Sequence, residues 1–470
     1  MAATRVLMLG WEFPPFIAGG LGTACYGLTK ALDKLGTKII FVLPRPVQAQ
    51  TSSHVEIRSP DPSTPLTPDV LAALGQPVQA DQTLADFKTL EFRTVMANLR
   101  PYDRPETFLA TGTRTEITPV GATNAALASA SSNQPDSAIE KPVVAPPANP
   151  APVASAPAQS GDHYGGDLFF EVDRYAAAVC AVARTAQFDI IHAHDWMTFP
   201  AAITVAGFTR KPLVIHVHST EFDRSGEHVN QRIYDIERAG MHHARRVICV
   251  SHLTRQIVLR RYGVSARKID VIYNGVEDNG PTRPIPPAIE RDERIVLFLG
   301  RITMQKGPEY FLAAAKKVLD FVENVRFVMA GTGDMTKRMI ELAAEMGIGH
   351  KVVFTGFLRG EDVRRVFRMA DLYVMPSVSE PFGITPLEAL SHDVPVLISK
   401  QSGVAEVLTH ALKVDFWDID EMTNKIVAVL RHPPLQKTLR DHGRIEIRRI
   451  TWDGAAERVV QTYQKVLVAP

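Results

Sequence analysis

Cysteine is scarce in this chain: only Cys25, Cys180 and Cys249 occur in 470 residues. Three cysteines this far apart provide neither a disulfide framework nor the paired spacing of a zinc site. Such usage fits a reducing compartment, so we expect a cytoplasmic protein.

Long hydrophobic runs are missing as well. No apolar run reaches the roughly 18 residues that a membrane span requires. The first residues, MAATRVLMLGWEFPP, hold too short an apolar stretch before Glu12 and Pro14 for a secretory signal. We therefore expect no stable membrane insertion.

The chain also lacks an excess of one charge, since 52 Lys and Arg face 51 Asp and Glu. This balance lacks the excess of positive charge that is typical of a nucleic-acid-binding protein. Hydrophobic residues make up 45% of the chain, which is enough for a substantial core and excludes wholesale disorder. At roughly 150 residues per domain, the length suggests about three domains or two large ones.

Short apolar runs that end at turn residues alternate with helical stretches, as in α/β proteins with a parallel sheet. In the first half, strands are expected at 5–10, 38–44, 188–194, 213–218, 246–251 and 268–276. A Pro- and Gly-rich stretch at 279–287 reads as an interdomain linker. A second series then predicts strands at 294–300, 326–331, 351–356, 372–376 and 394–399, with helices at 385–391 and 421–431.

Two segments do not fit this rhythm. Residues 45–118 show some signs of order but no clear strand pattern, and residues 119–161 contain eight Pro, twelve Ala, six Ser and no aromatic residue. A segment of that composition cannot bury enough surface to offset its chain entropy, so we predict a disordered insertion. The complete pattern predicts two doubly wound Rossmann-like domains, 1–279 and 280–452, and a final helix in 453–470 that packs back on the first domain.

The first candidate site is the glycine-rich loop between the first strand and the first helix. Gly19, Gly20 and Gly22 would let backbone N–H groups approach a phosphate at the helix N-terminus. A tight turn that merely needs glycine is an equally good explanation of this loop. The spacing is not that of the dinucleotide fingerprint.

Two cations follow the first strand of the second domain. Arg301 and Lys306 lie five residues apart, at the sheet edge where open α/β sheets bind ligands. The planar guanidinium and the ammonium could both reach one diphosphate. The alternative is a pair of solvated surface cations.

Two carboxylates flank the loop that opens the helix at 385–391. The N–H groups of Ile384 and Thr385, after Gly383, would offer an anion site. Glu388, one turn into the helix, could accept hydrogen bonds from ribose hydroxyls, and Glu380 could hold a sugar hydroxyl. Alternatively, Glu388 only complements the helix dipole.

A histidine pair ends the strand at 188–194. His192 and His194 alternate along the strand and therefore share one face, like a pair of metal ligands. We expect no metal, because no third ligand is evident nearby and Asp195 points elsewhere. His194 is the candidate for substrate contact, and a satisfied polar cluster is the alternative.

Two further polar segments carry weaker signals. The loop after strand 213–218 offers His218 and Glu221 as acceptor-side contacts, or it is simply exposed. Asp418 and Asp420 have the D-x-D spacing of a metal-diphosphate site, but Asp418 with Glu421 fits a helix cap, so we assign them to structure.

Together these motifs resemble the GT-B glycosyltransferases, in particular retaining family 4 and the related glycogen and starch synthases. The resemblance covers 5–44 and about 168–465 and is carried by the following motifs: Arg301 with Lys306, the E-x7-E pair Glu380 and Glu388, HAHDW at 192–196, and NGV at 274–276. It implies two domains facing a central cleft, the first holding the acceptor and the second the nucleotide sugar. One departure stands out: Ile17 occupies the position of the lysine in the Lys-x-Gly-Gly-Leu motif of bacterial and plant glycogen synthases.

The resemblance implies a retaining, metal-independent hexosyltransferase without a cofactor. UDP- or ADP-glucose would be the donor and a glycogen-like α-glucan the acceptor, with Arg301, Lys306, Glu380 and His194 as catalytic residues. Gly19, Gly20, Gly383, Ile384, Thr385 and Glu388 would complete the donor site. Other family 4 activities are alternatives, namely a sucrose-phosphate-type synthase or a transferase for a surface polysaccharide or glycolipid. A sugar-nucleotide 2-epimerase and a catalytically silent sugar-binding protein fit the motifs less well.

Overall fold

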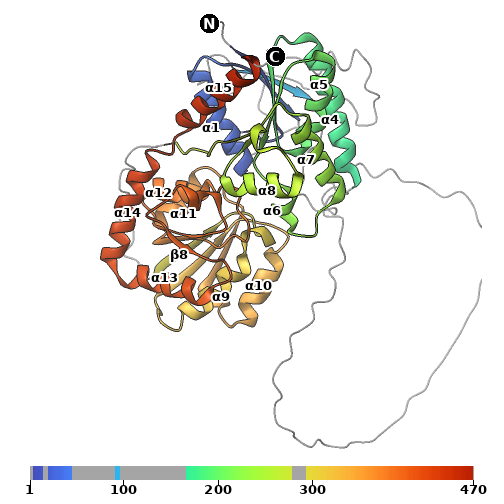
Figure 1. Ribbon diagram of the computed structural model, residues 1–470. Coiled ribbons are helices and arrows are strands. Elements are labelled where there is room, and N and C mark those ends of the chain that lie inside the picture. Colours follow the sequence, from blue (N-terminus) through green and yellow to red (C-terminus); the bar gives the residue numbers. More distant parts are fainter. Residues whose placement is uncertain (1–3, 14–18, 45–89, 96–165, 278–292, 469–470) are drawn as a thin grey trace, which may run out of the picture. The chain divides into compact units, whose positions relative to one another are not determined.

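The computed structural model describes residues 4–13, 19–44, 90–95, 166–277 and 293–468 (Figure 1). The predicted insertion at 119–161, Ile17 and the predicted linker at 279–287 lie outside these residues. All described residues belong to one packing unit of the chain.

The first sheet consists of seven parallel strands in the order β3-β2-β1-β4-β5-β6-β7. Its strands are β1 (Arg5–Leu9), β2 (Lys38–Pro44), β3 (Leu90–Val95), β4 (Ile190–His194), β5 (Leu213–Val217), β6 (Arg246–Cys249) and β7 (Ile269–Val271). Its helices are α1 (Gly20–Lys34), α4 (Gly166–Thr185), α5 (Phe199–Thr209), α6 (Glu221–Ser225), α7 (Gln231–His243) and α8 (His252–Tyr262), with 3-10 turns η2 (Trp196–Thr198) and η3 (Ala266–Lys268). Every residue of β4 and of β5 is buried, as expected for central strands covered on both faces.

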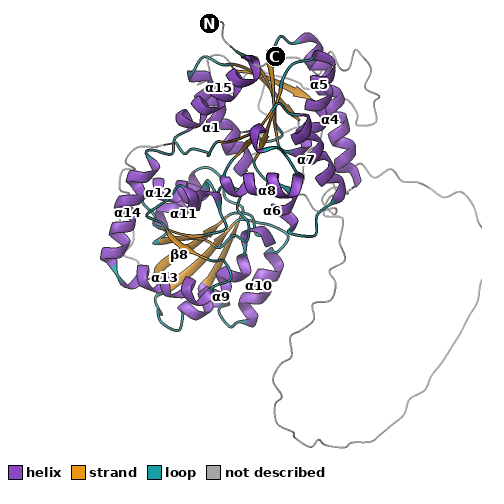
Figure 2. Cartoon of the chain, viewed as in Figure 1, coloured by secondary structure: helices purple, strands orange, loops and turns teal. Residues whose placement is uncertain are grey.

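The second sheet consists of six parallel strands in the order β10-β9-β8-β11-β12-β13 (Figure 2). Its strands are β8 (Arg294–Leu299), β9 (Val325–Ala330), β10 (Val352–Gly356), β11 (Leu372–Met375), β12 (Val396–Ser399) and β13 (Leu412–Val414). Its helices are α9 (Pro308–Val318), α10 (Thr336–Glu345), α11 (Glu361–Met369), α12 (Thr385–Ser391), α13 (Ile419–Arg431) and α14 (Pro433–Ile447), with 3-10 turns η4 (Met304–Lys306), η5 (Gly349–Lys351) and η6 (Gly403–Glu406). This arrangement confirms the predicted pair of doubly wound α/β sheets.

The structure departs from the predicted elements mainly at the sheet edges. Strands β3 and β13 were not predicted, and each pairs with a single neighbour, so neither has the continuous apolar run of a central strand. The strand expected at 268–276 is only Ile269–Val271, because the chain then leaves the sheet and Val276 forms an isolated bridge with Thr451.

The last helix, α15 (Trp452–Val468), lies against α1 of the first sheet, and Figure 1 shows the two side by side. Trp452 packs over Gly27, where an added Cβ would lie 2.2 Å from the Trp452 Cε2 atom. Further along α15, Tyr463 is buried and its hydroxyl reaches His192 of β4. The end of the chain therefore completes the core of the first sheet.

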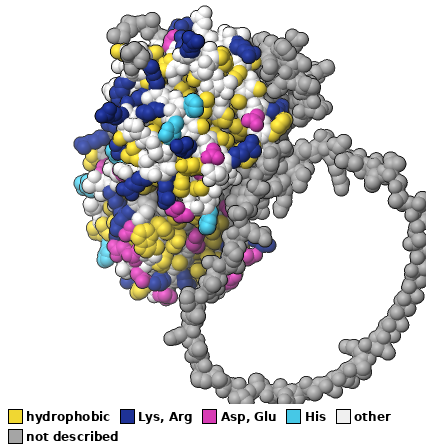
Figure 3. Space-filling model, turned by 45° about the vertical axis from the view of Figure 1, so that its right-hand side comes forward, with side chains coloured by type: hydrophobic (Ala, Val, Ile, Leu, Met, Phe, Trp, Pro, Cys, Tyr) yellow, Lys and Arg dark blue, Asp and Glu magenta, His cyan; other side chains and the backbone are white. Residues whose placement is uncertain are grey.

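Acidic and basic side chains both occur on the face drawn in Figure 3, in keeping with the balanced composition. Among the helices in the described ranges, none combines the length and the hydrophobicity needed to cross a bilayer.

Candidate functional site

Several of the predicted site residues follow the strands at the switch points of the two sheets. In the first sheet, the chain order reverses between β1 and β4, which are followed by the glycine loop and by Asp195. In the second, it reverses between β8 and β11, which are followed by Arg301 and by Glu380. Switch points at the carboxyl ends of strands are where open α/β sheets bind ligands.

The glycine loop already holds an anion from the chain itself. Helix α1 begins at Gly20, and the N–H of Gly22 donates a 3.0 Å hydrogen bond to Glu12 Oε2. A Cβ at Gly19 would lie 2.6 Å from the same oxygen, so Gly19 makes room for the carboxylate, whereas nothing lies within 4 Å of a Cβ at Gly20. Glu12 was not predicted as a site residue. The sequence signal that could have indicated it is a single acidic residue between an apolar strand and a glycine loop.

Four histidines from two neighbouring strands form a stack. His192 and His194 face the same way, as predicted, with ring centroids 4.4 Å apart, and His216 and His218 of the β5 segment stack at 4.2 Å. His194 Nδ1 and His218 Nε2 share a hydrogen bond of 2.9 Å, and His192 Nδ1 shares one of 2.6 Å with the Tyr463 hydroxyl. Burial lowers the pKa of His192 and of His218 to about 3, and that of the other two well below 6.5. The four rings are therefore neutral near pH 7.

The expectation that no third nitrogen lies near the histidine pair is wrong. His216 pairs with His194 in the strand register, and one nitrogen from each of His192, His194 and His216 lies within 4.8 Å of the others. Tetrahedral zinc needs nitrogens only about 3.4 Å apart, given Zn–N bonds of about 2.0–2.1 Å. The three rings are also within 10–30° of parallel, so their in-plane lone pairs do not converge on one point. The geometry is that of stacked neutral rings.

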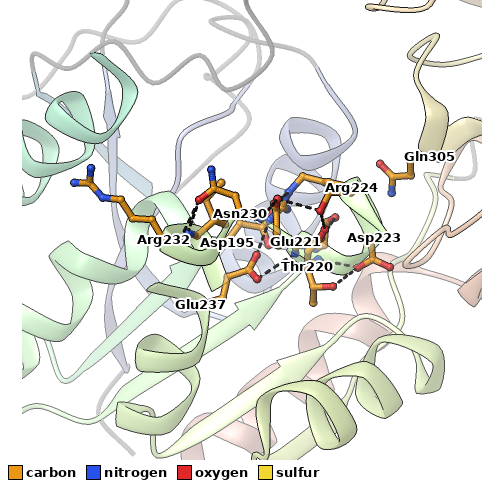
Figure 4. Close-up of polar contacts among 12 residues, drawn as sticks. Asp195, Thr220, Glu221, Asp223, Arg224, Asn230, Arg232, Glu237 and Gln305 are labelled. Carbon is orange, nitrogen blue, oxygen red and sulfur yellow. Dashed lines mark hydrogen bonds and ion pairs between the residues drawn. The ribbon is translucent and has the colours of Figure 1, made fainter. Parts of the chain in front are cut away.

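Helix α6, which follows β5, contains a half-buried arginine between two acids (Figure 4). Arg224 donates from Nε to Glu221 at 3.1 Å and from an Nη atom to Glu237 at 2.5 Å. Both carboxylates are buried, and burial raises the pKa of Glu237 while the Arg224 charge lowers it. The positive charge of Arg224 is thus balanced by one acid of α6 and one of α7.

The two residues predicted for the acceptor side differ in their surroundings. Glu221 Oε1 accepts from the Asn230 N–H and from the Ser225 hydroxyl, both at 3.1 Å, so this side chain is engaged within its own loop. His218 is half-buried and bonded to His194. Contact of either residue with an acceptor stays a prediction.

Asp195 joins the loops that follow β4 and β5. Its backbone has a φ of 57°, and its Oδ1 accepts from the N–H groups of His218 at 2.7 Å and Ser219 at 3.3 Å. Burial raises the pKa of Asp195 to about 7, while these N–H donors oppose the shift. Asp195 therefore fixes the segment that presents His218.

The two predicted cations of the second sheet each have polar partners. Lys306 forms an ion pair with the buried Glu380, whose Oε2 also accepts from Ser377 Oγ at 3.2 Å. Arg301 donates a long 3.5 Å bond to Gln305, whose amide in turn donates to the Ser379 carbonyl at 3.1 Å. The loops after β8 and β11 are thereby tied together, and Arg301, Lys306 and Glu380 are brought close to one another.

The loop before α12 has the predicted form. Gly383 has a φ of 98°, which favours glycine, and Ile384 and Thr385 open the helix without a side-chain cap. Burial raises the pKa of Glu388 to about 7, and the charges of Glu380 and Glu388 both raise the pKa of Tyr373. The two glutamates of the E-x7-E pair thus lie around one buried tyrosine.

Asp418 serves as the structural cap that the sequence predicted, because its side chain accepts from the Glu421 N–H at 3.0 Å. Asp420 instead pairs with Lys317. The three cysteines are unpaired.

Three family models match successive parts of the chain. The starch synthase catalytic domain matches residues 5–108, glycosyltransferase family 4 matches 143–279, and glycosyl transferases group 1 matches 283–446.

Curated relatives agree with these matches. The chain is 32% identical to the uncharacterised glycosyltransferase MJ1607 of Methanocaldococcus jannaschii, over 59% of this chain and 75% of that protein. It is 29% identical to a D-inositol 3-phosphate glycosyltransferase of Segniliparus rotundus, over 46% of this chain and 50% of that one. It is 27% identical to a glycogen synthase of Mycobacterium tuberculosis, over 47% of this chain and 54% of that protein. The chain thus spans about half the length of the last two relatives.

Solved structures share the fold. A sucrose-phosphate synthase from Thermosynechococcus elongatus superposes with a TM-score of 0.67 at 19% identity, covering 99% of this chain and 100% of that one. Anabaena Alr3699/HepE in complex with UDP-glucose superposes with a TM-score of 0.63 at 16% identity, covering 98% and 99%.

Proposed function

Because the chain belongs to the GT-B glycosyltransferases of group 1 and family 4, we propose that it transfers a glucosyl unit from a nucleotide sugar to an α-glucan with retention of configuration. The observation that carries the proposal is the placement of Arg301, Lys306 and Glu380 together at the switch point of the second sheet.

The donor diphosphate would bind Arg301 and Lys306. Both side chains lie in the loop after β8, and a planar guanidinium and an ammonium together match the charge of a diphosphate. The bound UDP-glucose of the HepE structure supports a uridine donor, with ADP-glucose as the competing candidate. Glu388, half-buried in the first turn of α12, would accept hydrogen bonds from the ribose.

The sugar would lie against His194 and Glu380. His194 is fully buried, and its Nε2 has no hydrogen-bond partner among the described residues, so a sugar hydroxyl that reached this nitrogen would satisfy it. Because the ring is neutral near pH 7, it would orient the sugar through a hydrogen bond rather than by charge.

The bond between the anomeric carbon and the β-phosphate oxygen would break as the acceptor oxygen bonds to the same face of that carbon. The acceptor proton would pass to the departing phosphate oxygen. Arg301 and Lys306 would stabilise the negative charge that develops there, which is the main electrostatic contribution. We propose that these two cations perform this task without a divalent metal.

A neutral glycan suits the described acceptor side better than a phosphorylated sugar. Arg224 of α6 is balanced by Glu221 and Glu237 and so offers little charge to a phosphate. The match of residues 5–108 to the starch synthase catalytic domain supports the same choice.

The test is nucleotide release from UDP-glucose and from ADP-glucose, each with and without glycogen. Release that depends on glycogen and lengthens its chains, with α-linkages by NMR, supports the proposal and names the donor. Release that responds to fructose 6-phosphate or to an inositol phosphate, and not to glycogen, would replace the α-glucan by a phosphorylated acceptor. β-Linked product would reject retention.

A further inference from the structure

We infer that Glu12 is a resident anion of the glycine loop, occupying the position assigned to a donor phosphate and giving way to it on binding. The inference rests on the proposed function for the identity of the incoming ligand. Its basis in the molecule is the surroundings of one buried carboxylate.

The carboxylate lies at the start of α1, where the first N–H groups of a helix lack intrahelical partners. Glu12 Oε2 accepts from the Gly22 N–H at 3.0 Å, and the backbone of Gly19 donates a second hydrogen bond that lowers the pKa of Glu12. Glu12 is only 6% exposed. A side chain at Gly19 would collide with it, since its Cβ would lie 2.6 Å from Oε2.

Arg301 also acts on this carboxylate, although it follows a strand of the other sheet. Its positive charge lowers the pKa of Glu12, while burial raises that pKa to about 6. Glu12 therefore accepts from backbone N–H groups of a helix start and lies within the electrostatic influence of a guanidinium. These are the groups that bind phosphate in proteins, so on this inference a diphosphate would compete with the carboxylate for one place.

A purely structural role for Glu12 is the main alternative. Helix α1 has no side-chain cap from Gly19 and no acidic residue in its first turn, so Glu12 could simply cap it. The two roles differ in their consequence for anions. If Glu12 is only a cap that stays in place, removing its charge leaves the affinity of the protein for anions unchanged. If Glu12 competes with an incoming anion, removing its charge raises that affinity.

The experiment measures binding of inorganic pyrophosphate and of UDP to the full chain by isothermal titration. Glu12→Gln removes the charge with little change of shape, and we expect it to bind both ligands about three- to tenfold more tightly than wild type. Glu171→Gln is the matched control, because Glu171 is also a buried, ion-paired carboxylate of the first domain but lies on α4. It is expected to bind both ligands as wild type does.

Unchanged or weaker pyrophosphate binding by Glu12→Gln, or no pyrophosphate binding by either protein, overturns the inference. ADP is titrated in the same way, because ADP-glucose is the competing donor. Tighter pyrophosphate binding without any binding of UDP or ADP would support the inference and reject the proposed function, so the two failures are distinguishable. If Glu12→Gln folds poorly, Glu12→Asp gives the same comparison. Its side chain is one methylene shorter, so the carboxylate lies farther from the glycine loop and competes less with an anion there. Tighter pyrophosphate binding by that variant supports the inference, and equal or weaker binding overturns it.

Discussion

Ser379 Oγ donates a 2.6 Å hydrogen bond to Asp223 Oδ1, joining the loop after β11 to helix α6, which follows β5 of the first sheet. Asp223 is 2% exposed, and its other oxygen accepts from the Thr220 N–H and hydroxyl, each at 2.7 Å. Ser379 immediately precedes Glu380, the partner of Lys306. The bond therefore connects the loop proposed to bind the donor with α6.

We expect Ser379→Ala to lower the free energy of unfolding by about 1 kcal/mol, because a buried carboxylate loses one donor. Urea denaturation of Ser379→Ala, Asp223→Asn and the double variant gives the coupling between the two side chains. Thr204→Ala is the control, since Thr204 is exposed and its hydroxyl donates to the Pro200 carbonyl within its own helix. A coupling energy near zero would show that the bond contributes nothing.

Arg301→Ala and Lys306→Ala are each expected to lower kcat/KM by about 100- to 1000-fold, since each removes one of the donors proposed for the leaving phosphate. Circular dichroism should show that both variants remain folded. The control is Lys337→Ala, which removes an exposed lysine of α10 and should leave the rate unchanged. Near-normal activity in both variants would contradict the assigned roles.

The Asp195→Asn variant should have a higher free energy of unfolding than wild type at alkaline pH, and this difference should disappear in acid. The pKa of Asp195 is about 7 in the folded chain and ordinarily about 3.8, so between these values the folded state holds a proton that the unfolded state releases. Wild-type stability therefore falls as pH rises from about 4 to about 7, whereas Asn has no proton to lose. We expect the free energy of unfolding of the variant, relative to wild type, to increase by about 2–4 kcal/mol between pH 4 and pH 8, as measured by urea denaturation. A difference that is the same at both pH values would contradict the raised pKa.

Gly27→Ala should destabilise the contact between α1 and α15. The added Cβ would meet the Trp452 ring at 2.2 Å, and overpacking of this kind costs about 1–3 kcal/mol. Gly207→Ala is a matched control on α5, because nothing lies within 4 Å of its Cβ, and it should stabilise that helix by about 0.5–1 kcal/mol. Melting temperatures of the two variants should shift in opposite directions. A rise for both would mean that α15 does not press on Gly27.

Local patterns were sufficient for much of the fold. The helix at 385–391 has the predicted bounds, because Pro386 in the first turn is a strong start signal. The alternation of His192 and His194 predicted their shared face. Edge strand β3 escaped prediction, since a strand with one partner lacks the continuous apolar run that marks a central strand.

Contacts between distant segments were not predictable in this way. His216 lies 24 residues from His192 and approaches it only because β5 pairs with β4 in one register. Glu12 and Arg301 act on each other across nearly 300 positions of sequence, and no periodicity carries that information.

The sequence by itself determined most of the α/β elements, the two series of strands and the candidate residues for a nucleotide-sugar site, because apolar runs, turn residues and motifs are local signals. Only the tertiary structure decided which of these residues meet. Strand order and register depend on packing between remote segments. This packing brings together the ion pair of Lys306 with Glu380 and the hydrogen bonds of Ser379 with Asp223 and of the glycine loop with Glu12.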